Sequence, residues 1–216
     1  MDLDFITLPL QTENTLTIGI GIRKTWILIN FSSFVFLKKT SEMTDIKFGT
    51  DGWRAIIAKE FTTDNVARVS LAVANFLNEK NENPSVVIGH DCRFAGELFA
   101  ETAAKVLATK GVKVLLAKDF VSTPMVSLGV INYKSNIGVV ITASHNPPSY
   151  NGYKLKGDFG GPLLSHDITD VENRIPDYNS IDINSIKIDD LIESGMIKYI
   201  DLEDDYCKHA ENNFDL

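Results

Sequence analysis

Short apolar runs alternate along the chain with segments whose apolar residues recur every three or four positions. The runs are rich in Val, Ile and Leu, which is typical of strands buried on both faces. The intervening segments have helical spacing and begin at capping residues such as Thr63 and Thr123. The strands predicted in this way are 85–89, 112–117, 137–141, 153–156 and 196–201, and the helices are 63–77, 96–110, 122–134, 165–175 and 204–214.

This alternation of strands and helices predicts an α/β fold. Strand–helix–strand units give parallel strands, and their crossovers place helices on both faces of the sheet. We therefore expect a three-layer α/β/α domain with a mostly parallel mixed sheet over residues 43–216. Residues 176–195 follow neither period and are expected to carry little regular structure.

Residues 1–42 do not match this pattern. Their apolar run, 26–37, is flanked by basic residues, but it is shorter than the roughly 20 apolar residues that span a bilayer. It also lacks the small-residue cleavage pattern of a signal peptide. We interpret residues 1–42 as a non-native or disordered extension upstream of a start at Met43. A membrane-tethered form that uses residues 25–37 is the alternative.

Composition places the chain among soluble globular proteins. Hydrophobic residues make up 44% and charged residues 23% of its 216 positions. The formal net charge of −8 argues against a nucleic-acid partner, because phosphate backbones bind basic surfaces, but a small phosphorylated ligand needs only a local positive site. Cys92 and Cys207 have neither disulfide nor zinc spacing, which favours a reducing, cytoplasmic location without a membrane partner.

The strongest candidate chemistry follows the predicted strand 137–141. Small and polar residues come first, and two prolines at 147–148 then exclude both helix and ladder hydrogen bonding. Ser144 is therefore expected on a rigid loop at the carboxyl end of a strand, where open α/β sheets bind their ligands. A second tight turn is predicted at Asn151-Gly152, after which a short strand returns Lys154 towards Ser144.

Further polar side chains are predicted at the same edge of the sheet. His90, Asp91 and Arg93 follow the strand 85–89 directly. Arg54 follows a turn between two glycines at 49–52 and is well placed to bind phosphate oxygens.

Three serine chemistries compete at Ser144. Acyl transfer needs a histidine base held by a carboxylate, but His145 is adjacent in sequence, so the two side chains would tend to diverge. A purely structural loop serine is the second reading. Phosphoryl transfer needs a hydroxyl, cations and a proton carrier, which Ser144 together with Arg54, Arg93 and Lys154 would supply.

Three segments resemble one enzyme family, the α-D-phosphohexomutases, which include phosphoglucomutases and phosphomannomutases. Thr142-Ala-Ser-His-Asn-Pro-Pro-Ser-Tyr-Asn-Gly-Tyr-Lys154 resembles the family's phosphoserine loop, and Phe48-Gly-Thr-Asp-Gly-Trp-Arg54 its amino-terminal signature. Gly89-His-Asp-Cys-Arg93 resembles a further arginine segment. The segments occur in the family's order, so the resemblance implies the fold of phosphohexomutase domain I, with the chain ending near the start of domain II.

The resemblance implies a reaction and catalytic residues. Phosphorylated Ser144 would give its phosphoryl group to a hexose monophosphate, and the other phosphoryl group of the hexose bisphosphate would return to Ser144. Hexose 1-phosphate and hexose 6-phosphate would thus be interconverted. Lys154 would act as general acid and base, and His145 would line the loop. A lysine acts as a base only when burial or a cationic neighbour favours its neutral form.

The resemblance also implies binding roles. Arg54 would anchor phosphate beside Ser144, with Asn146 lining the loop and Arg93 at the edge of the site. A Mg²⁺ ion would be bound through the phosphate on Ser144. The family's Asp-x-Asp-x-Asp metal loop and its sugar-selecting loop do not occur in this sequence. The remaining carboxylate ligands are thus expected in a domain that this chain lacks, and we interpret the chain as a fragment that is inactive alone.

Two other functions remain open at this point. A phosphoglucosamine mutase fragment is the nearest alternative enzyme. A non-catalytic module that binds phosphosugars is the alternative from a different class. The sequence does not indicate which hexose phosphate binds or the oligomeric state.

Overall fold

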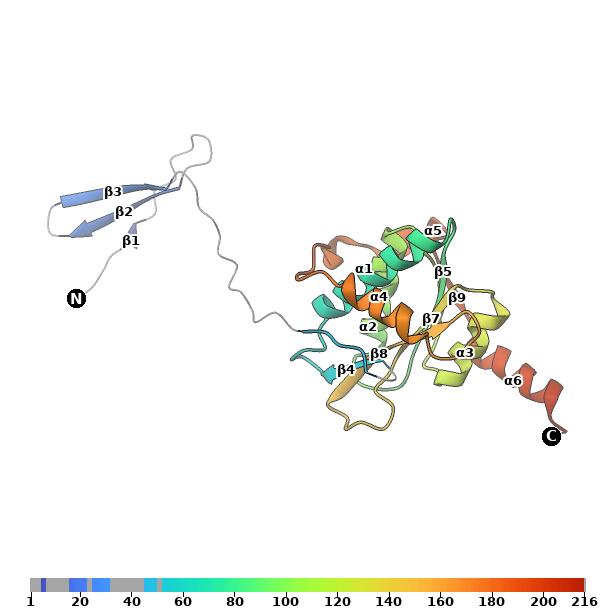
Figure 1. The fold of residues 1–216 in the computed structure, drawn as a ribbon. Helices are drawn as coiled ribbons and strands as arrows, with labels where there is room; N and C mark the ends of the chain where they lie inside the picture. Colours follow the sequence, from blue (N-terminus) through green and yellow to red (C-terminus); the bar gives the residue numbers. More distant parts are fainter. Residues whose placement is uncertain (1–4, 7–15, 23–24, 32–44, 50–51, 216) are drawn as a thin grey trace. The chain divides into compact units, whose positions relative to one another are not determined.

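The computed structural model describes residues 5–6, 16–22, 25–31, 45–49 and 52–215 (Figure 1). The chain divides into two compact units, residues 1–42 and residues 43–216, and each unit is described by itself.

The described backbone of the first unit forms an antiparallel three-stranded sheet in the order β1-β2-β3. Its strands are β1 (Phe5–Ile6), β2 (Leu16–Ile22) and β3 (Thr25–Phe31). Leu16 is paired with Phe31 and Ile22 with Thr25. The interpretation of residues 1–42 as a non-native or disordered extension stays a prediction, and residues 32–37 of the apolar run lie outside the described residues.

The second unit is built on a six-stranded mixed sheet in the order β4-β8-β7-β5-β6-β9. Three neighbouring pairs, β7–β5, β5–β6 and β6–β9, are parallel, whereas β8 is antiparallel to both β7 and β4. The strands are β4 (Trp53–Ile56), β5 (Ser85–His90), β6 (Lys113–Ala117), β7 (Ile137–Ile141), β8 (Tyr150–Gly157) and β9 (Ile197–Ile200).

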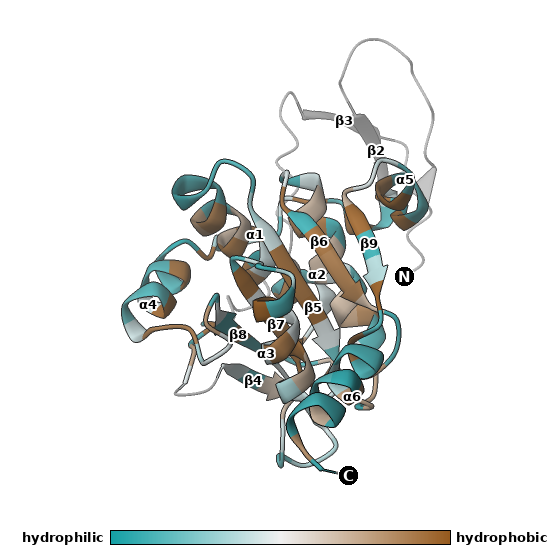
Figure 2. Ribbon diagram, turned by 90° about the vertical axis from the view of Figure 1, so that its right-hand side faces the viewer, coloured by the Kyte–Doolittle hydropathy of each residue, from teal (hydrophilic) through white to brown (hydrophobic). Residues whose placement is uncertain are grey.

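Helices cover both faces of this sheet, as Figures 1 and 2 show. α1, α2, α4 and α5 lie on one side, and α3 and α6 pack together on the other. The helical segments are α1 (Thr63–Lys80), α2 (Gly96–Thr109), α3 (Thr123–Asn132), α4 (Ser165–Asn173), the 3₁₀ turn η1 (Ile183–Ser185), α5 (Ile188–Glu193) and α6 (Leu202–Asn213).

The alternation of side chains along the central strands explains why the sheet has a core on each face. On β7, Val139 packs in the core under α1 and α2, while its neighbour Val140 packs in the core under α3 and α6. On β5, Ile88 and Val87 divide between the same two cores. A strand buried on both faces has no polar side, which is why these strands read as continuous apolar runs (Figure 2). The predicted α/β/α fold with a mostly parallel mixed sheet is confirmed.

Two local predictions are wrong. Asn151-Gly152 is not a turn, because β8 begins at Tyr150 and both residues lie buried within it. Residues 176–195 contain regular structure, the 3₁₀ turn η1 and the helix α5. These two elements are too short to give a periodic signal.

The predicted helix caps are each shifted by one residue. α1 is capped by Thr62, whose Oγ1 accepts a hydrogen bond from the backbone N–H of Asn65 at 3.2 Å. α3 has Ser122 rather than Thr123 at its N-cap, because Thr123 and Pro124 are already in the first turn. Where neighbouring residues can all act as caps, the sequence does not fix which of them precedes the helix, so the predicted start differs by one position.

Candidate active site

The carboxyl ends of β5 and β7 bring two of the singled-out segments together. The strands are parallel neighbours with His90 opposite Ile141, and the N–H of Asp91 donates to the carbonyl of Ile141 at 3.1 Å. The chain turns away after both residues, so the Arg93 segment and the Ser144 loop share one edge of the sheet. This is the placement that the sequence predicts.

Ser144 lies at the tip of this edge with an exposed side chain. Its φ angle is 54°, in the left-handed region that residues with a Cβ rarely adopt. Its N–H donates to Oγ1 of Thr142 at 3.0 Å. Strained backbone of this kind is often found at functional sites, where the surrounding structure maintains it.

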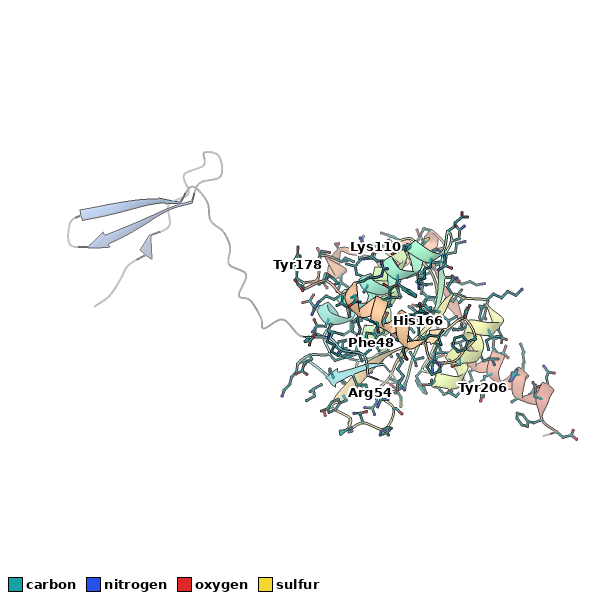
Figure 3. The ribbon with its side chains drawn as sticks, viewed as in Figure 1. Phe48, Arg54, Lys110, His166, Tyr178 and Tyr206 are labelled. Carbon is teal, nitrogen blue, oxygen red and sulfur yellow. The ribbon has the colours of Figure 1, made fainter. Side chains whose placement is uncertain are left out.

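Arg54 reaches the Ser144 loop from the edge strand β4. Its Nη1 donates to Oδ1 of Asn146 at 2.8 Å, and its backbone is paired with Gly152 of β8. Figure 3 labels Arg54 near β4, and its side chain is half-buried. The structure thus brings together Arg54, Asn146 and Ser144, three of the predicted site residues.

Two glycines allow these segments to approach closely. A Cβ on Gly152 would lie 2.5 Å from the carbonyl oxygen of Thr142 and 2.9 Å from that of Trp53. Gly52 has a φ of 98°, and a Cβ there would lie 2.8 Å from Cγ of Lys154. Gly49 and Gly52 also pair with each other across the predicted turn, whose Thr50 and Asp51 lie outside the described residues.

Lys154 is placed beside the strand that leads to Ser144. β8 runs antiparallel to β7, and Lys154 is paired with Val140. The neighbouring Tyr153 enters the core under α1, so Lys154 leaves the opposite face of the strand. Only 4% of Lys154 is exposed.

Tyr153 anchors this strand to the helical layer. The side chain is fully buried, and its hydroxyl lies 3.2 Å from Oγ of Ser70 on α1. Burial raises the pKa of Tyr153 well above its ordinary value, and the hydrogen bond to Ser70 offsets only part of this effect. Tyr153 is therefore a neutral anchor beside Lys154.

Arg93 lies against the inner side of the Ser144 loop. Its two Nη nitrogens donate to the carbonyl oxygens of Ser144, Asn146, Pro147 and Tyr150 at 2.6–2.9 Å. Arg93 was predicted at the edge of the site, and the structure places it there as a contact of the loop backbone.

His145 is exposed at the tip of the loop. Its Nδ1 lies 3.5 Å from Oγ of Ser144, which is long for a hydrogen bond that would activate a hydroxyl. This separation agrees with the expectation that the two adjacent side chains diverge. The geometry does not favour acyl transfer at Ser144.

Two further residues contact the loop: Thr142, which was given no role from the sequence, and Asp91, which was predicted at this edge of the sheet but was also given no role. Oγ1 of Thr142 donates to Oδ2 of Asp91 at 2.5 Å, and it accepts the N–H of Ser144. Both residues are visible in the sequence at the ends of neighbouring strands. Their spacing carries no signal that the two side chains meet.

The chemistry that the described residues can supply is limited. Within the described residues, no group of three His, Cys, Asp or Glu side chains is positioned to hold a metal ion. None of the described helices is long and apolar enough to cross a membrane. The site therefore offers a hydroxyl, arginines and a buried lysine.

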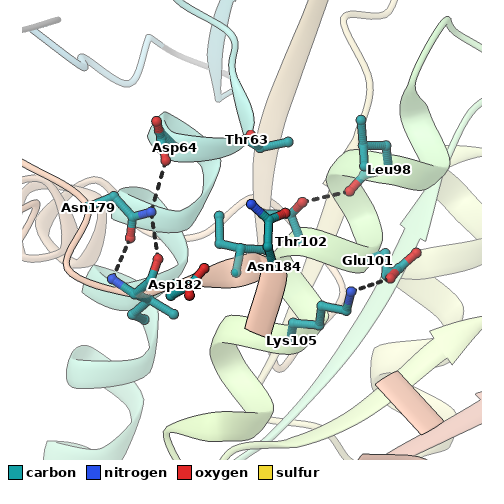
Figure 4. A pocket seen from close by; sticks show the side chains of 11 residues that line it. Thr63, Asp64, Leu98, Glu101, Thr102, Lys105, Asn179, Asp182 and Asn184 are labelled. Carbon is teal, nitrogen blue, oxygen red and sulfur yellow. Dashed lines mark hydrogen bonds and ion pairs between the residues drawn. The ribbon is translucent and has the colours of Figure 1, made fainter. Parts of the chain in front are cut away.

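A pocket of about 300 Å³ lies elsewhere, between α1, α2 and residues 179–184 (Figure 4). None of its lining residues belongs to the predicted site. Lys105 Nζ lies 2.6 Å from Glu101, and Asn179 Nδ2 donates to Asp64 at 3.0 Å. The pocket therefore shares no lining residue with the Ser144 site.

Comparison with known proteins identifies the family. The family model for phosphoglucomutase/phosphomannomutase, alpha/beta/alpha domain I, matches residues 45–182. The chain belongs to the phosphoglucomutase/phosphomannomutase family. A Staphylococcus saprophyticus phosphoglucomutase is 34% identical over 164 residues, which are 73% of this chain and 29% of that protein. A phosphoglucomutase of a bovine Staphylococcus aureus strain is 34% identical over 178 residues, 77% of this chain and 31% of the relative. The chain thus spans under a third of these relatives.

Solved structures of the family have the same fold. A Thermus thermophilus protein assigned as a phosphomannomutase superimposes with a TM-score of 0.71 at 34% identity, over 80% of this chain and 37% of that one. A Burkholderia thailandensis phosphoglucomutase/phosphomannomutase family protein has a TM-score of 0.63 at 20% identity, over 81% and 37% of the two chains. The second likeness concerns the fold alone. The membership predicted from the three sequence segments, for the amino-terminal domain, is confirmed.

Proposed function

We propose that this chain provides the phosphoserine-bearing domain of a phosphohexomutase. The reaction interconverts hexose 1-phosphate and hexose 6-phosphate through a hexose bisphosphate. The observation that carries the proposal is the position of Ser144, an exposed residue after the carboxyl end of β7, on a loop that Arg54 contacts through Asn146 and next to the strand of Lys154. The family membership is shown for the domain, and we propose in addition that the domain takes part in the whole reaction.

The proposed cycle has two phosphoryl transfers. In the first, the bond between phosphorus and Oγ of Ser144 breaks and a bond to a hydroxyl of the hexose monophosphate forms. Lys154 accepts the proton of this hydroxyl and delivers it to the departing Oγ, so that Ser144 is left as a hydroxyl. In the second, the other phosphoryl group of the bisphosphate returns to Oγ of Ser144, and the proton of the Ser144 hydroxyl passes through Lys154 to the sugar oxygen that the phosphoryl group leaves.

Charge is the main requirement of this cycle. A phosphoserine carries a charge of about −1.5 to −2 at neutral pH. Arg54, whose Nη1 donates to Asn146 of the same loop, carries a planar guanidinium whose geometry suits phosphate oxygens. Mg²⁺, when bound through the phosphate on Ser144, offsets further negative charge, and its carboxylate ligands are supplied from outside these 216 residues. We therefore expect slow or no multiple turnover by this chain alone.

Phosphate on Ser144 is the direct test. The purified chain is incubated with a hexose 1,6-bisphosphate and Mg²⁺, and phosphopeptides are mapped by mass spectrometry over long times, so that a single slow transfer is detected. We expect phosphate on Ser144 and none in Ser144→Ala. Ser149→Ala is the matched control, because Ser149 is an exposed serine of the same loop, and it should keep the label.

The alternatives give different outcomes. A non-catalytic module that binds phosphosugars would bind the bisphosphate and leave Ser144 unmodified, and that result would overturn the proposal. A phosphoglucosamine mutase domain would take the phosphoryl group faster from glucosamine 1,6-bisphosphate than from glucose or mannose 1,6-bisphosphate.

A further inference from the structure

Arg93 donates hydrogen bonds from both of its Nη nitrogens to the backbone of the Ser144 loop. Nη1 donates to the carbonyls of Pro147 and Tyr150, both at 2.9 Å. Nη2 donates to those of Ser144 at 2.7 Å and Asn146 at 2.6 Å. Each Nη nitrogen of a guanidinium carries two N–H groups, so these four bonds account for all of them. A phosphate could be bound by Arg93 at Nη1 or Nη2 only if one of these bonds were given up or shared.

The sequence of the loop fits this arrangement. The carbonyls of Asn146 and Pro147 belong to peptide units whose nitrogen is that of a proline, so turning them towards Arg93 leaves no N–H without a partner on the other side. The unit between Ser144 and His145 is trans, and its N–H points opposite to its carbonyl. With the Ser144 carbonyl bound to Arg93, the N–H of His145 therefore points away from the guanidinium.

A second set of hydrogen bonds fixes the other side of Ser144. The Ser144 N–H can only donate, so Oγ1 of Thr142 accepts it at 3.0 Å. The proton of the Thr142 hydroxyl is then directed to Oδ2 of Asp91, at 2.5 Å. Oδ1 of Asp91 accepts the backbone N–H of Arg93 at 3.0 Å, and Oδ2 lies 3.6 Å from Nε of Arg93. The carboxylate thereby links both sets.

Together the two sets hold the peptide units on either side of Ser144. The unit before it is held through its N–H by Thr142, and the unit after it through its carbonyl by Arg93. The φ of 54° at Ser144 lies in the left-handed region, which is unfavourable for a residue with a Cβ. These contacts maintain it, and the direction of the Cα–Cβ bond follows from the fixed backbone.

We infer that Asp91, Arg93 and Thr142 are positioning residues that hold Ser144 in the conformation in which its hydroxyl accepts a phosphoryl group. The inference rests on the proposed function of Ser144. It gives Arg93 a role through the loop backbone, where the resemblance left its role at the edge of the site open. A catalytic group displaced by a small distance loses much of its rate, so these contacts are expected to set the rate of phosphoryl uptake.

The test compares Thr142→Val, which removes the hydroxyl, with Thr142→Ser, which keeps it. Thr102→Val is the matched control, because Thr102 is also buried and its hydroxyl donates to a carbonyl, that of Leu98 on α2, away from the loop. Arg93→Lys is paired with Arg68→Lys in the same way, since Arg68 is a buried arginine whose Nε donates to the carbonyl of Pro176 at 2.7 Å.

Three quantities are measured on each variant of the full chain. They are the exchange rate of the Ser144 amide proton by NMR, the single-turnover rate of phosphoryl uptake by Ser144 from glucose 1,6-bisphosphate, and the unfolding temperature. For Thr142→Val we expect about tenfold faster exchange and about tenfold slower uptake, the effect of one lost hydrogen bond. Thr142→Ser should be close to the wild type. Arg93→Lys should show both changes, and the two controls neither, whatever their unfolding temperatures.

Several results would overturn the inference. They are wild-type uptake by Thr142→Val, equal behaviour of Thr142→Val and Thr142→Ser, and a slowing of uptake in all variants that follows only the unfolding temperature. A wild-type chain that takes up no phosphoryl group overturns the proposed function instead. In that case the exchange rates, which need no phosphate, still decide whether Thr142 and Arg93 hold the loop.

Discussion

Arg54 Nη1 donates a hydrogen bond to Oδ1 of Asn146 at 2.8 Å, across 92 positions of sequence. The bond connects the edge strand β4 to the loop that carries Ser144. The bond also fixes the orientation of the Asn146 amide group. Its oxygen accepts the bond from Arg54, so its nitrogen points away from Arg54. The amino-terminal signature and the serine loop are thus one structural unit, although they lie far apart in the chain.

Replacing Arg54 tests its proposed role as a phosphate anchor. Arg54→Ala should weaken the binding of glucose 1-phosphate by about 10- to 100-fold, the range for a lost hydrogen bond to a charged group. Isothermal titration calorimetry measures the affinity. Arg174→Ala is the control, because Arg174 directly follows α4 and is paired with Glu79 and Asp170. Equal affinities for the wild type and Arg54→Ala would contradict the role.

Lys154 and Lys156 form a natural matched pair. They lie two residues apart on β8, leave the same face, and are 4% and 7% exposed. Lys154→Met should slow phosphoryl transfer between phosphorylated Ser144 and a hexose monophosphate by about 10²- to 10⁴-fold, the usual contribution of a positioned acid or base. Lys156→Met should slow it much less, although both variants lose a buried amino group. Similar rates for the two variants in single-turnover experiments would exclude Lys154 as the proton carrier.

Gly152 should tolerate no side chain. In Gly152→Ala the new Cβ would meet two carbonyl oxygens, at 2.5 and 2.9 Å, and neither is the end of a flexible side chain. We expect a loss of about 3 kcal/mol in the free energy of unfolding, measured in urea. Gly111→Ala is the control, since its φ of 84° is unfavourable for alanine but its Cβ has open space. It should lose about 1 kcal/mol, and a smaller loss for Gly152→Ala than for Gly111→Ala would contradict the packing.

Tyr133 should make stability fall in alkali. Its hydroxyl donates to Oδ2 of Asp205 at 2.8 Å, joining α3 to α6. Burial first, and then the hydrogen bond and charge of Asp205, raise the pKa of Tyr133 from 10.0 to about 12. Because the folded state holds this proton more tightly, its contribution to stability is complete below pH 10 and is lost as the pH rises towards about 12.

The measurement for Tyr133 is urea unfolding across this range of pH. Tyr133→Phe should reduce the loss of stability between pH 10 and about 12. Tyr178→Phe, at a tyrosine that is 70% exposed, should leave it as in the wild type. A wild type and a Tyr133→Phe variant with parallel pH profiles would show that the contact with Asp205 does not persist in solution.

The layers of the fold were predictable because each central element carries its own local signal, a continuous apolar run for a strand or helical spacing for a helix. The run at 137–141 is apolar at every position, which only a strand covered on both faces requires. The order of the strands in the sheet was harder to predict from the sequence. β8 lies between β4 and β7, and Asn151-Gly152 gives a strong local signal for a turn, which tertiary contacts override. Gly152 is needed there because the backbones of Thr142 and Trp53 approach it.

The sequence placed Ser144 and Arg93 at strand ends and Arg54 beside a turn, but it did not indicate the contacts that these residues make. Their roles in the reaction stay predictions. That Arg93 binds loop carbonyls depends on where a long side chain ends, which spacing does not encode. The same holds for Asp91 and Thr142, 51 positions apart, whose hydrogen bond exists only after β5 and β7 have paired. The role of Lys154 and the binding of Mg²⁺ stay predictions.

The central claim is that Ser144 carries a phosphoryl group and transfers it to a sugar. The chain is labelled on Ser144 with radioactive phosphate from a hexose 1,6-bisphosphate, separated from the donor, and mixed with glucose 1-phosphate. The account predicts that the label leaves Ser144 and appears in a hexose bisphosphate, at a rate that Lys154→Met lowers. Label that stays on the protein, or that is released only as inorganic phosphate, would contradict it.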